Sequence, residues 1–188
     1  MKRFLFIFIL LVAGCSNPKN QKQINVFETE LGENNVEVLN LLVSDFETNL
    51  KELYPELKLK DAYKQYLLDI SDKKTKDFQK FKFQTKKTQT KFHESGFWDE
   101  IYRYEYYSED SFTNTIDSTK SLSANNFGKY MAALYEIKDT DSLIYRYWDI
   151  REAAGLLPDS MFVDGILYFN PDFDNYFHKR IVVIEYSF

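Results

Sequence analysis

The chain has 188 residues, a formal net charge of −5, 44% apolar residues and 18% aromatic residues. This length suits a single domain with enough apolar residues to form its own core. Cys15 is the only cysteine, which excludes an internal disulfide, and the acidic balance argues against nucleic acid as a partner.

The first 14 residues have the organisation of an export signal. Lys2 and Arg3 precede nine apolar residues at positions 4–12, and the small residues Ala13 and Gly14 follow. A cationic start, a short apolar run and a small-residue cleavage site are typical of secretory signals. The apolar run is too short to cross a bilayer as a helix, which takes about 20 residues. We therefore predict a cleaved signal peptide over residues 1–14.

Residues 11–15, Leu-Val-Ala-Gly-Cys, resemble the lipobox of bacterial lipoproteins. The resemblance implies cleavage before Cys15, attachment of a diacylglycerol to the Cys15 thiol and acylation of its new amino group. Two or more acyl chains anchor a protein stably in membrane lipid, whereas one chain binds marginally. The chain is thus expected in the cell envelope as a membrane-anchored lipoprotein. Because Ser16 rather than Asp follows the cysteine, the outer membrane is favoured over the inner one in a cell that has both.

The anchor is expected to connect to one domain through a flexible segment. Residues 15–33 begin with a polar, unpatterned stretch, which predicts a tether. Residues 34–188 would then form the single domain.

Apolar spacing predicts helices in the first half of this domain. Between residues 35 and 53 the apolar positions recur at steps of mostly three and four, which predicts a long helix ended by Pro55. A second helix is expected from about Lys60, and a third around Phe78 and Phe81.

The middle of the chain leaves two structures open. Alternating Tyr102, Tyr104 and Tyr106 suit a strand, but the spacing of Trp98, Ile101, Tyr102 and Tyr106 suits a helix. Residues 108–126 are rich in Ser, Thr, Asn and Asp, which predicts a loop.

Four short helices are expected in the last third. Asn126, then Asp139 or Asp141, then Pro158 and Pro171 would begin them, and Gly155 would end the second. The β-branched residues of 180–186 allow a strand as a rival. The pattern as a whole predicts a mainly α fold, either a bundle or a short helical array, with at most a small strand pair.

A block of lysines interrupts the acidic chain. Residues 73–91 contain one acidic residue and eight lysines, namely Lys73, Lys74, Lys76, Lys80, Lys82, Lys86, Lys87 and Lys91. Such a block could contact an anionic surface. A solvated lysine-rich surface is the simpler interpretation, and we favour it.

No motif of catalytic or metal chemistry stands out. His93 and His178 are the only histidines and no free thiol accompanies them, so neither a zinc site nor a cofactor is expected. No Gly-x-Ser-x-Gly motif is present to suggest a serine hydrolase. Trp98 and Trp148 are expected in the core, and Gly165 is expected to mark close helix packing.

The sequence therefore supports two hypotheses about function. The favoured one is a non-catalytic binding or interaction module, held by membrane lipid through Cys15, with an envelope protein or an anionic surface as the candidate partner. The alternative is an envelope glycan hydrolase that uses the carboxylates of Glu94, Asp99 and Glu100 beside Trp98.

Overall fold

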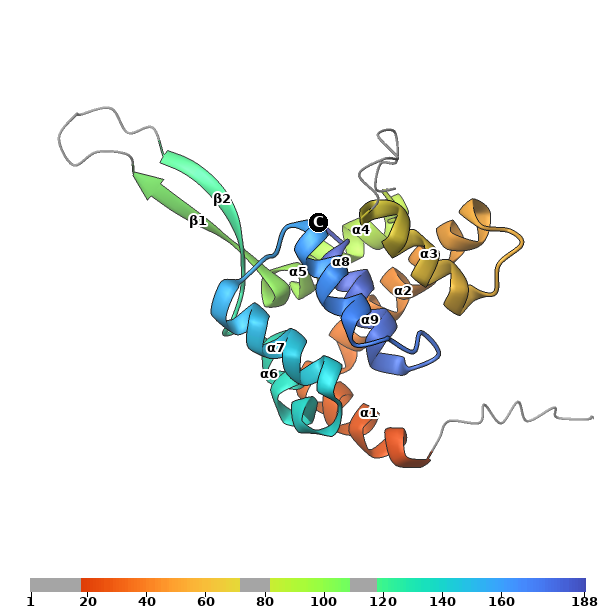
Figure 1. The fold of residues 1–188 in the computed structure, drawn as a ribbon. Coiled ribbons are helices and arrows are strands. Elements are labelled where there is room, and N and C mark those ends of the chain that lie inside the picture. The colour runs from red at the N-terminus through yellow and green to blue at the C-terminus, as the bar shows by residue number, and fades with distance from the viewer. Residues whose placement is uncertain (1–17, 72–81, 109–117) are drawn as a thin grey trace, which may run out of the picture.

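The computed structural model describes residues 18–71, 82–108 and 118–188 (Figure 1). Residues 1–14 and Cys15 lie outside these ranges. The elements in chain order are α1 (Pro18–Leu31), α2 (Glu33–Leu53), α3 (Leu59–Ser71), α4 (Lys86–Glu94), α5 (Phe97–Ile101), β1 (Tyr102–Ser108), β2 (Ser118–Ala124), α6 (Lys129–Ile137), the 3₁₀ turn η1 (Lys138–Thr140), α7 (Ser142–Ala154), α8 (Asp159–Tyr168) and α9 (Tyr176–Glu185). The prediction of a mainly helical domain with a small strand pair is confirmed.

Helices α2 and α9 pack against each other in the centre of the domain, where α9 also contacts α7 (Figure 1). Helix α2 buries one face, which includes Leu39, Leu42 and Phe46. In α9 the four consecutive residues 181–184 are all buried. A helix that is apolar on all sides belongs in a core, where neighbours cover every face. This environment explains why residues 180–185 are helical, although the β-branched side chains of 180–186 allowed a strand.

The predicted tether over residues 15–33 is wrong for most of its length. Residues 18–31 form α1, which packs along α6. The ring of Phe27 contacts Tyr130 and Phe177 edge to face, with ring centroids 6.5 and 5.5 Å apart. Leu31 is fully buried. Ile24, Phe27 and Leu31 are spaced by three and four residues, which is a helical stripe inside an otherwise polar segment.

Proline, glycine and short polar side chains set most helix boundaries as predicted. Helix α2 ends at Leu53, just before Pro55. Asp141 caps α7 by accepting hydrogen bonds from Leu143 N and Ile144 N, at 2.8 and 3.3 Å. Gly155 ends α7 with a φ of 71°, a conformation that favours glycine.

Two predicted helix starts are displaced. Gly128 rather than Asn126 precedes α6. Helix α9 begins at Tyr176 rather than near Pro171, because the Asn175 side chain accepts a hydrogen bond from Phe177 N and so caps it there.

The middle of the chain forms a helical turn followed by a hairpin. Helix α5 ends at Ile101, and β1 pairs antiparallel with β2 in a register from Tyr102↔Ala124 to Ser108↔Ser118. The hairpin projects from the helical body (Figure 1). The predicted loop over 108–126 is therefore wrong for residues 118–124. A two-stranded arm in solvent needs little apolar patterning, so its second strand resembles a loop in sequence.

The lysine-rich block is described only from Lys82 onward, so the helix predicted around Phe78 and Phe81 lies outside the described residues. Lys82, Lys86 and Lys87 are exposed. Lys91 forms an ion pair with Glu37 of α2. The described part of the block is therefore a solvated surface, and its Lys91 links α4 to α2 through this ion pair.

Candidate functional site

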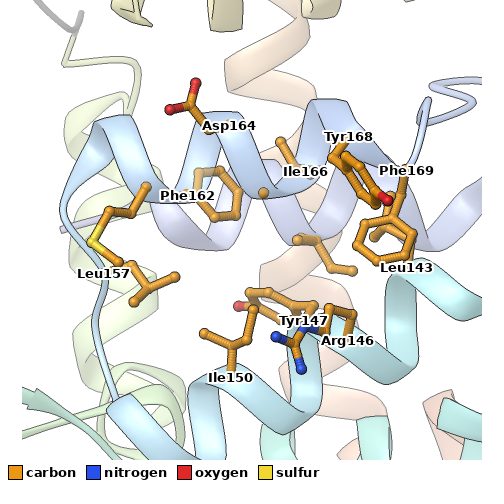
Figure 2. Close-up of a pocket in the computed structure, with 13 residues that line it drawn as sticks. Leu143, Arg146, Tyr147, Ile150, Leu157, Phe162, Asp164, Ile166, Tyr168 and Phe169 are labelled. Carbon is orange, nitrogen blue, oxygen red and sulfur yellow. The ribbon is translucent and has the colours of Figure 1, made fainter.

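The side chains of α7 and α8 enclose a cavity of about 370 Å³, with Ile181 of α9 as part of its wall (Figure 2). Its lining is almost entirely apolar, and Arg146 and Asp164 are the charged residues. The lining residues are Leu143, Arg146, Tyr147, Ile150, Leu157, Met161, Phe162, Asp164, Gly165, Ile166, Tyr168, Phe169 and Ile181.

Local sequence explains why α7 and α8 stand apart here. Gly155 ends α7 with a positive φ, and Pro158 precedes α8, so a short connection reverses the chain between the two walls. Gly165 lies in the middle of α8, and a Cβ added there would have no heavy atom within 4 Å. The expectation that Gly165 marks close helix packing is therefore wrong. Its missing side chain leaves the cavity open.

The rim of the cavity is apolar and reaches solvent. Met161 is 59% exposed and Tyr168 is 84% exposed, both on α8. Arg146 lies on the α7 side, and Asp164 projects from the α8 side away from the cavity (Figure 2). An exposed apolar patch next to a cavity marks a contact surface more often than scattered apolar residues do.

A buried ion pair fixes the α7 wall from behind. Arg151 is 1% exposed and Glu185 is 6% exposed, and the Arg151 Nη1 donates to the Glu185 carboxylate. The Tyr147 hydroxyl accepts from Arg151 Nη1 at 3.2 Å and donates to Glu185 Oε1 at 2.6 Å. Arg151 Nη2 donates to the Ile101 carbonyl at 3.2 Å. The Tyr147 ring thus lines the cavity while its hydroxyl is held by the ion pair.

The protonation states in this cluster follow from burial and charge. Burial raises the pKa of the Tyr147 hydroxyl well above its ordinary value, so this hydroxyl stays a donor to Glu185. Burial alone would lower the pKa of Arg151, but Tyr147 and Glu185 outweigh it and raise that pKa. The cluster is therefore an internal ion pair that positions Tyr147.

The three carboxylates of the hydrolase hypothesis do not form a cleft. Glu94 and Asp99 are exposed at the end of α4 and in α5. Glu100 Oε2 instead accepts a hydrogen bond from Lys129 N at 2.7 Å and caps the first turn of α6. None of the three lines the cavity between α7 and α8. This placement gives no support to glycan hydrolysis, which needs two carboxyl groups facing one bond.

The two histidines lie in different environments. His93 is exposed on α4, with its ring centroid 5.7 Å from that of Trp98. His178 is buried, where its Nδ1 accepts from Asp172 N at 3.0 Å and its Nε2 lies 3.2 Å from Asp141 Oδ2. The hydrogen bond from His178 lowers the pKa of Asp141, so this helix cap stays ionised. Within the described ranges, no group of three His, Cys, Asp or Glu side chains is placed to hold a metal ion.

The tryptophans lie close to their predicted environments. Trp98 is buried at the start of α5, beside Tyr102. Trp148 is partly buried and packs against the core from α7.

Sequence reasoning missed the cavity. Its lining residues come from α7, the α7–α8 connection, α8, the residue that follows α8, and α9. The spacing of residues within any one of these segments therefore does not indicate a cavity. One signal was available in the sequence. Gly165 lies in the middle of the apolar helix α8, between Met161 and Tyr168, which are both exposed.

Two further findings concern membrane-spanning helices and similarity to known proteins. Within residues 18–71, 82–108 and 118–188, no helix combines the length and the apolar character needed to cross a membrane. No family model, curated protein or solved structure matches this chain.

Proposed function

We propose that this chain is a non-catalytic binding module, tethered in the cell envelope through Cys15, whose ligand site is the cavity between α7 and α8. The observation that carries the proposal is the open apolar cavity with its exposed rim. Small-molecule sites are typically concave, mostly apolar and about 300–1,000 Å³ in volume, with a few polar groups for orientation. The cavity, at about 370 Å³ with Arg146 as a polar group on its α7 side, has these properties.

The lining also supports binding rather than chemistry. It contains no histidine, serine, threonine or cysteine. Of its charged residues, Arg146 lies on the α7 side and Asp164 points away from the cavity. The Tyr147 hydroxyl is engaged by Arg151 and Glu185. A catalytic site needs a nucleophile or a positioned acid and base near the substrate, and this cavity offers apolar contact area instead.

Filling the cavity tests this proposal. Gly165→Phe places an aromatic side chain in open space, so we expect the variant to fold and to lose most binding of the uncharged fluorophore N-phenyl-1-naphthylamine. Gly165→Ala adds one methyl group at the same position and serves as the matched control, with binding close to that of the unaltered protein. Fluorescence titration measures both. Equal fluorophore binding by Gly165→Phe and the unaltered protein would show that the cavity is not the binding site.

The anchor has its own test. Cys15→Ser removes the thiol that the lipobox resemblance assigns to lipid attachment, so incorporation of labelled fatty acid should be abolished. The variant should accumulate as an uncleaved precursor or leave the membrane fraction. Ser16→Ala, which keeps the thiol, is the control and should remain labelled. Undiminished labelling of Cys15→Ser would refute the lipoprotein proposal.

A further inference from the structure

A second hollow adjoins the apolar cavity and shares Arg146 and Phe169 with it. This second hollow is more open and is built around the 3₁₀ turn and the start of α7. Its other lining residues are Lys138, Asp139, Thr140, Asp141, Ser142 and Tyr145. We call the two together the joined site, with an apolar cavity and a polar basin.

The polar basin carries charges of both signs and an aromatic surface. Lys138 Nζ lies 3.0 Å from Asp139 Oδ1, and Asp139 is 76% exposed. Tyr145 is 46% exposed, and its ring contributes with Tyr135 and Trp148 to an aromatic group around Lys138 Nζ at 4.9–5.4 Å. Lys138 Nζ thus already contacts one oxygen of Asp139 and this aromatic group. The exposed remainder of Asp139 and Tyr145 is what a ligand's ammonium group could contact, because carboxylates and aromatic faces attract such groups.

Arg146 lines both the cavity and the basin, and its guanidinium forms only a weak, exposed ion pair. It pairs with Asp149 at 2.8 Å, but both side chains are about half exposed. Exposed pairs of this kind contribute little to stability, so a better anion can replace Asp149 easily. Guanidinium groups bind phosphate and carboxylate oxygens in a two-point geometry that lysine cannot reproduce.

We propose that the joined site binds one molecule of a single-chain amphiphile with a zwitterionic phosphate–ammonium headgroup. This inference rests on the proposed function and names the ligand class for the same site. The alkyl chain occupies the apolar cavity between α7 and α8. The phosphate lies against Arg146, and the ammonium group lies in the basin near Asp139 and Tyr145.

The size of the cavity limits the ligand to one chain. At roughly 30 Å³ for a group of water-like size, 370 Å³ holds on the order of ten methylene groups. Each methylene group that leaves water adds to the affinity, so a chain of this length supplies most of it. The lining offers no room for a second chain of that size. The ligand is therefore a monomeric amphiphile and not a membrane surface.

The charges in the basin do not suit a headgroup that is only anionic or only cationic. An anionic headgroup would face Asp139, Asp141 and Asp149 as well as Arg146. A cationic headgroup would face Lys138 and Arg146. A zwitterion satisfies both sets of charges, because its two groups can separate along the basin.

The test uses dodecylphosphocholine below its micelle concentration as the probe, measured by calorimetry and by displacement of N-phenyl-1-naphthylamine. We expect dodecylphosphocholine to bind the unaltered protein, with Gly165→Phe abolishing its binding. Arg146→Gln should weaken binding of dodecylphosphocholine about tenfold, because it removes a charge-assisted hydrogen bond to phosphate. Arg103→Gln removes a similarly exposed arginine from the hairpin pair with Glu105 and is the matched control, with no effect.

The outcomes separate this inference from the proposed function. If the fluorophore binds and Gly165→Phe blocks it, but dodecylphosphocholine does not compete, the cavity is a binding site and the amphiphile inference is overturned. If Arg146→Gln binds dodecylphosphocholine as tightly as the unaltered protein does, the headgroup placement is overturned. Equal retention of the unaltered protein and Gly165→Phe on phosphatidylcholine vesicles would assign the surface to membrane contact and also overturn it. Fluorophore binding that Gly165→Phe does not change defeats the proposed function itself.

Discussion

Replacing Arg151 by Met should lower the free energy of unfolding by about 3–5 kcal/mol, because it leaves the buried Glu185 carboxylate without its partner. Urea denaturation followed by circular dichroism measures this loss. The same change removes the donor that holds the Tyr147 hydroxyl, so the α7 wall of the cavity should also loosen. Fluorophore binding by Arg151→Met reports this second effect.

Two controls distinguish a buried pair from an ordinary one. Lys60→Met removes an exposed pair with Asp174, in which the side chains are 49% and 71% exposed, and should cost less than about 1 kcal/mol. The double variant Arg151→Met/Glu185→Leu replaces the ion pair by apolar side chains and should recover much of the lost stability, because no unpaired charge remains. A single variant as stable as the double variant would show that Glu185 does not depend on Arg151.

The second large effect is expected at Gly128, at the start of α6. An added Cβ would lie 2.0 Å from the Glu100 carbonyl oxygen and 2.7 Å from its carbon, and these are backbone atoms that cannot turn aside. Gly128→Ala should therefore destabilise the protein by about 2–3 kcal/mol through displacement of α5 from α6. Thermal and urea unfolding measure the change.

Gly165→Ala is the matched control, because it makes the same substitution where no atom lies within 4 Å of the new Cβ. Alanine has a higher helix propensity than glycine, so this variant should gain about 0.5–1 kcal/mol. The two glycine variants should thus shift the unfolding midpoint in opposite directions. A loss of stability in both would mean that α8 packs more closely at Gly165 than the structure shows.

The two proposals rest on different parts of the chain. Attachment through Cys15 depends on residues 1–15, for which the lipobox resemblance is the support. Ligand binding depends on α7, η1 and α8, where the support is the geometry of the joined site. The two sets of variants therefore test localisation and binding separately, and either can fail without the other.

Local chemistry in the sequence determined much of the helical framework. The apolar stripe of α2 and its stop at Pro55, the cap at Asp141 and the end of α7 at Gly155 all lie where the sequence predicts them. Each depends on contacts within a few residues, such as a side-chain oxygen on a free backbone N–H or a backbone angle that glycine favours. The alternation of Tyr102, Tyr104 and Tyr106 likewise favoured a strand, which was one of the two structures that the sequence left open and which the protein forms as β1.

Tertiary structure decided everything that depends on distant partners. Helix α1 forms because Phe27 packs against Tyr130 of α6 and Phe177 of α9, and β2 forms because β1 offers a partner for its backbone. The sequence has no local signal for the pairing of Arg151 with Glu185, 34 residues apart. The same holds for the cavity, which exists only where α7, α8 and α9 leave space that their side chains do not fill. Capping and periodicity are short-range interactions that a sequence displays directly, whereas cavities and buried charges result from how separate helices pack.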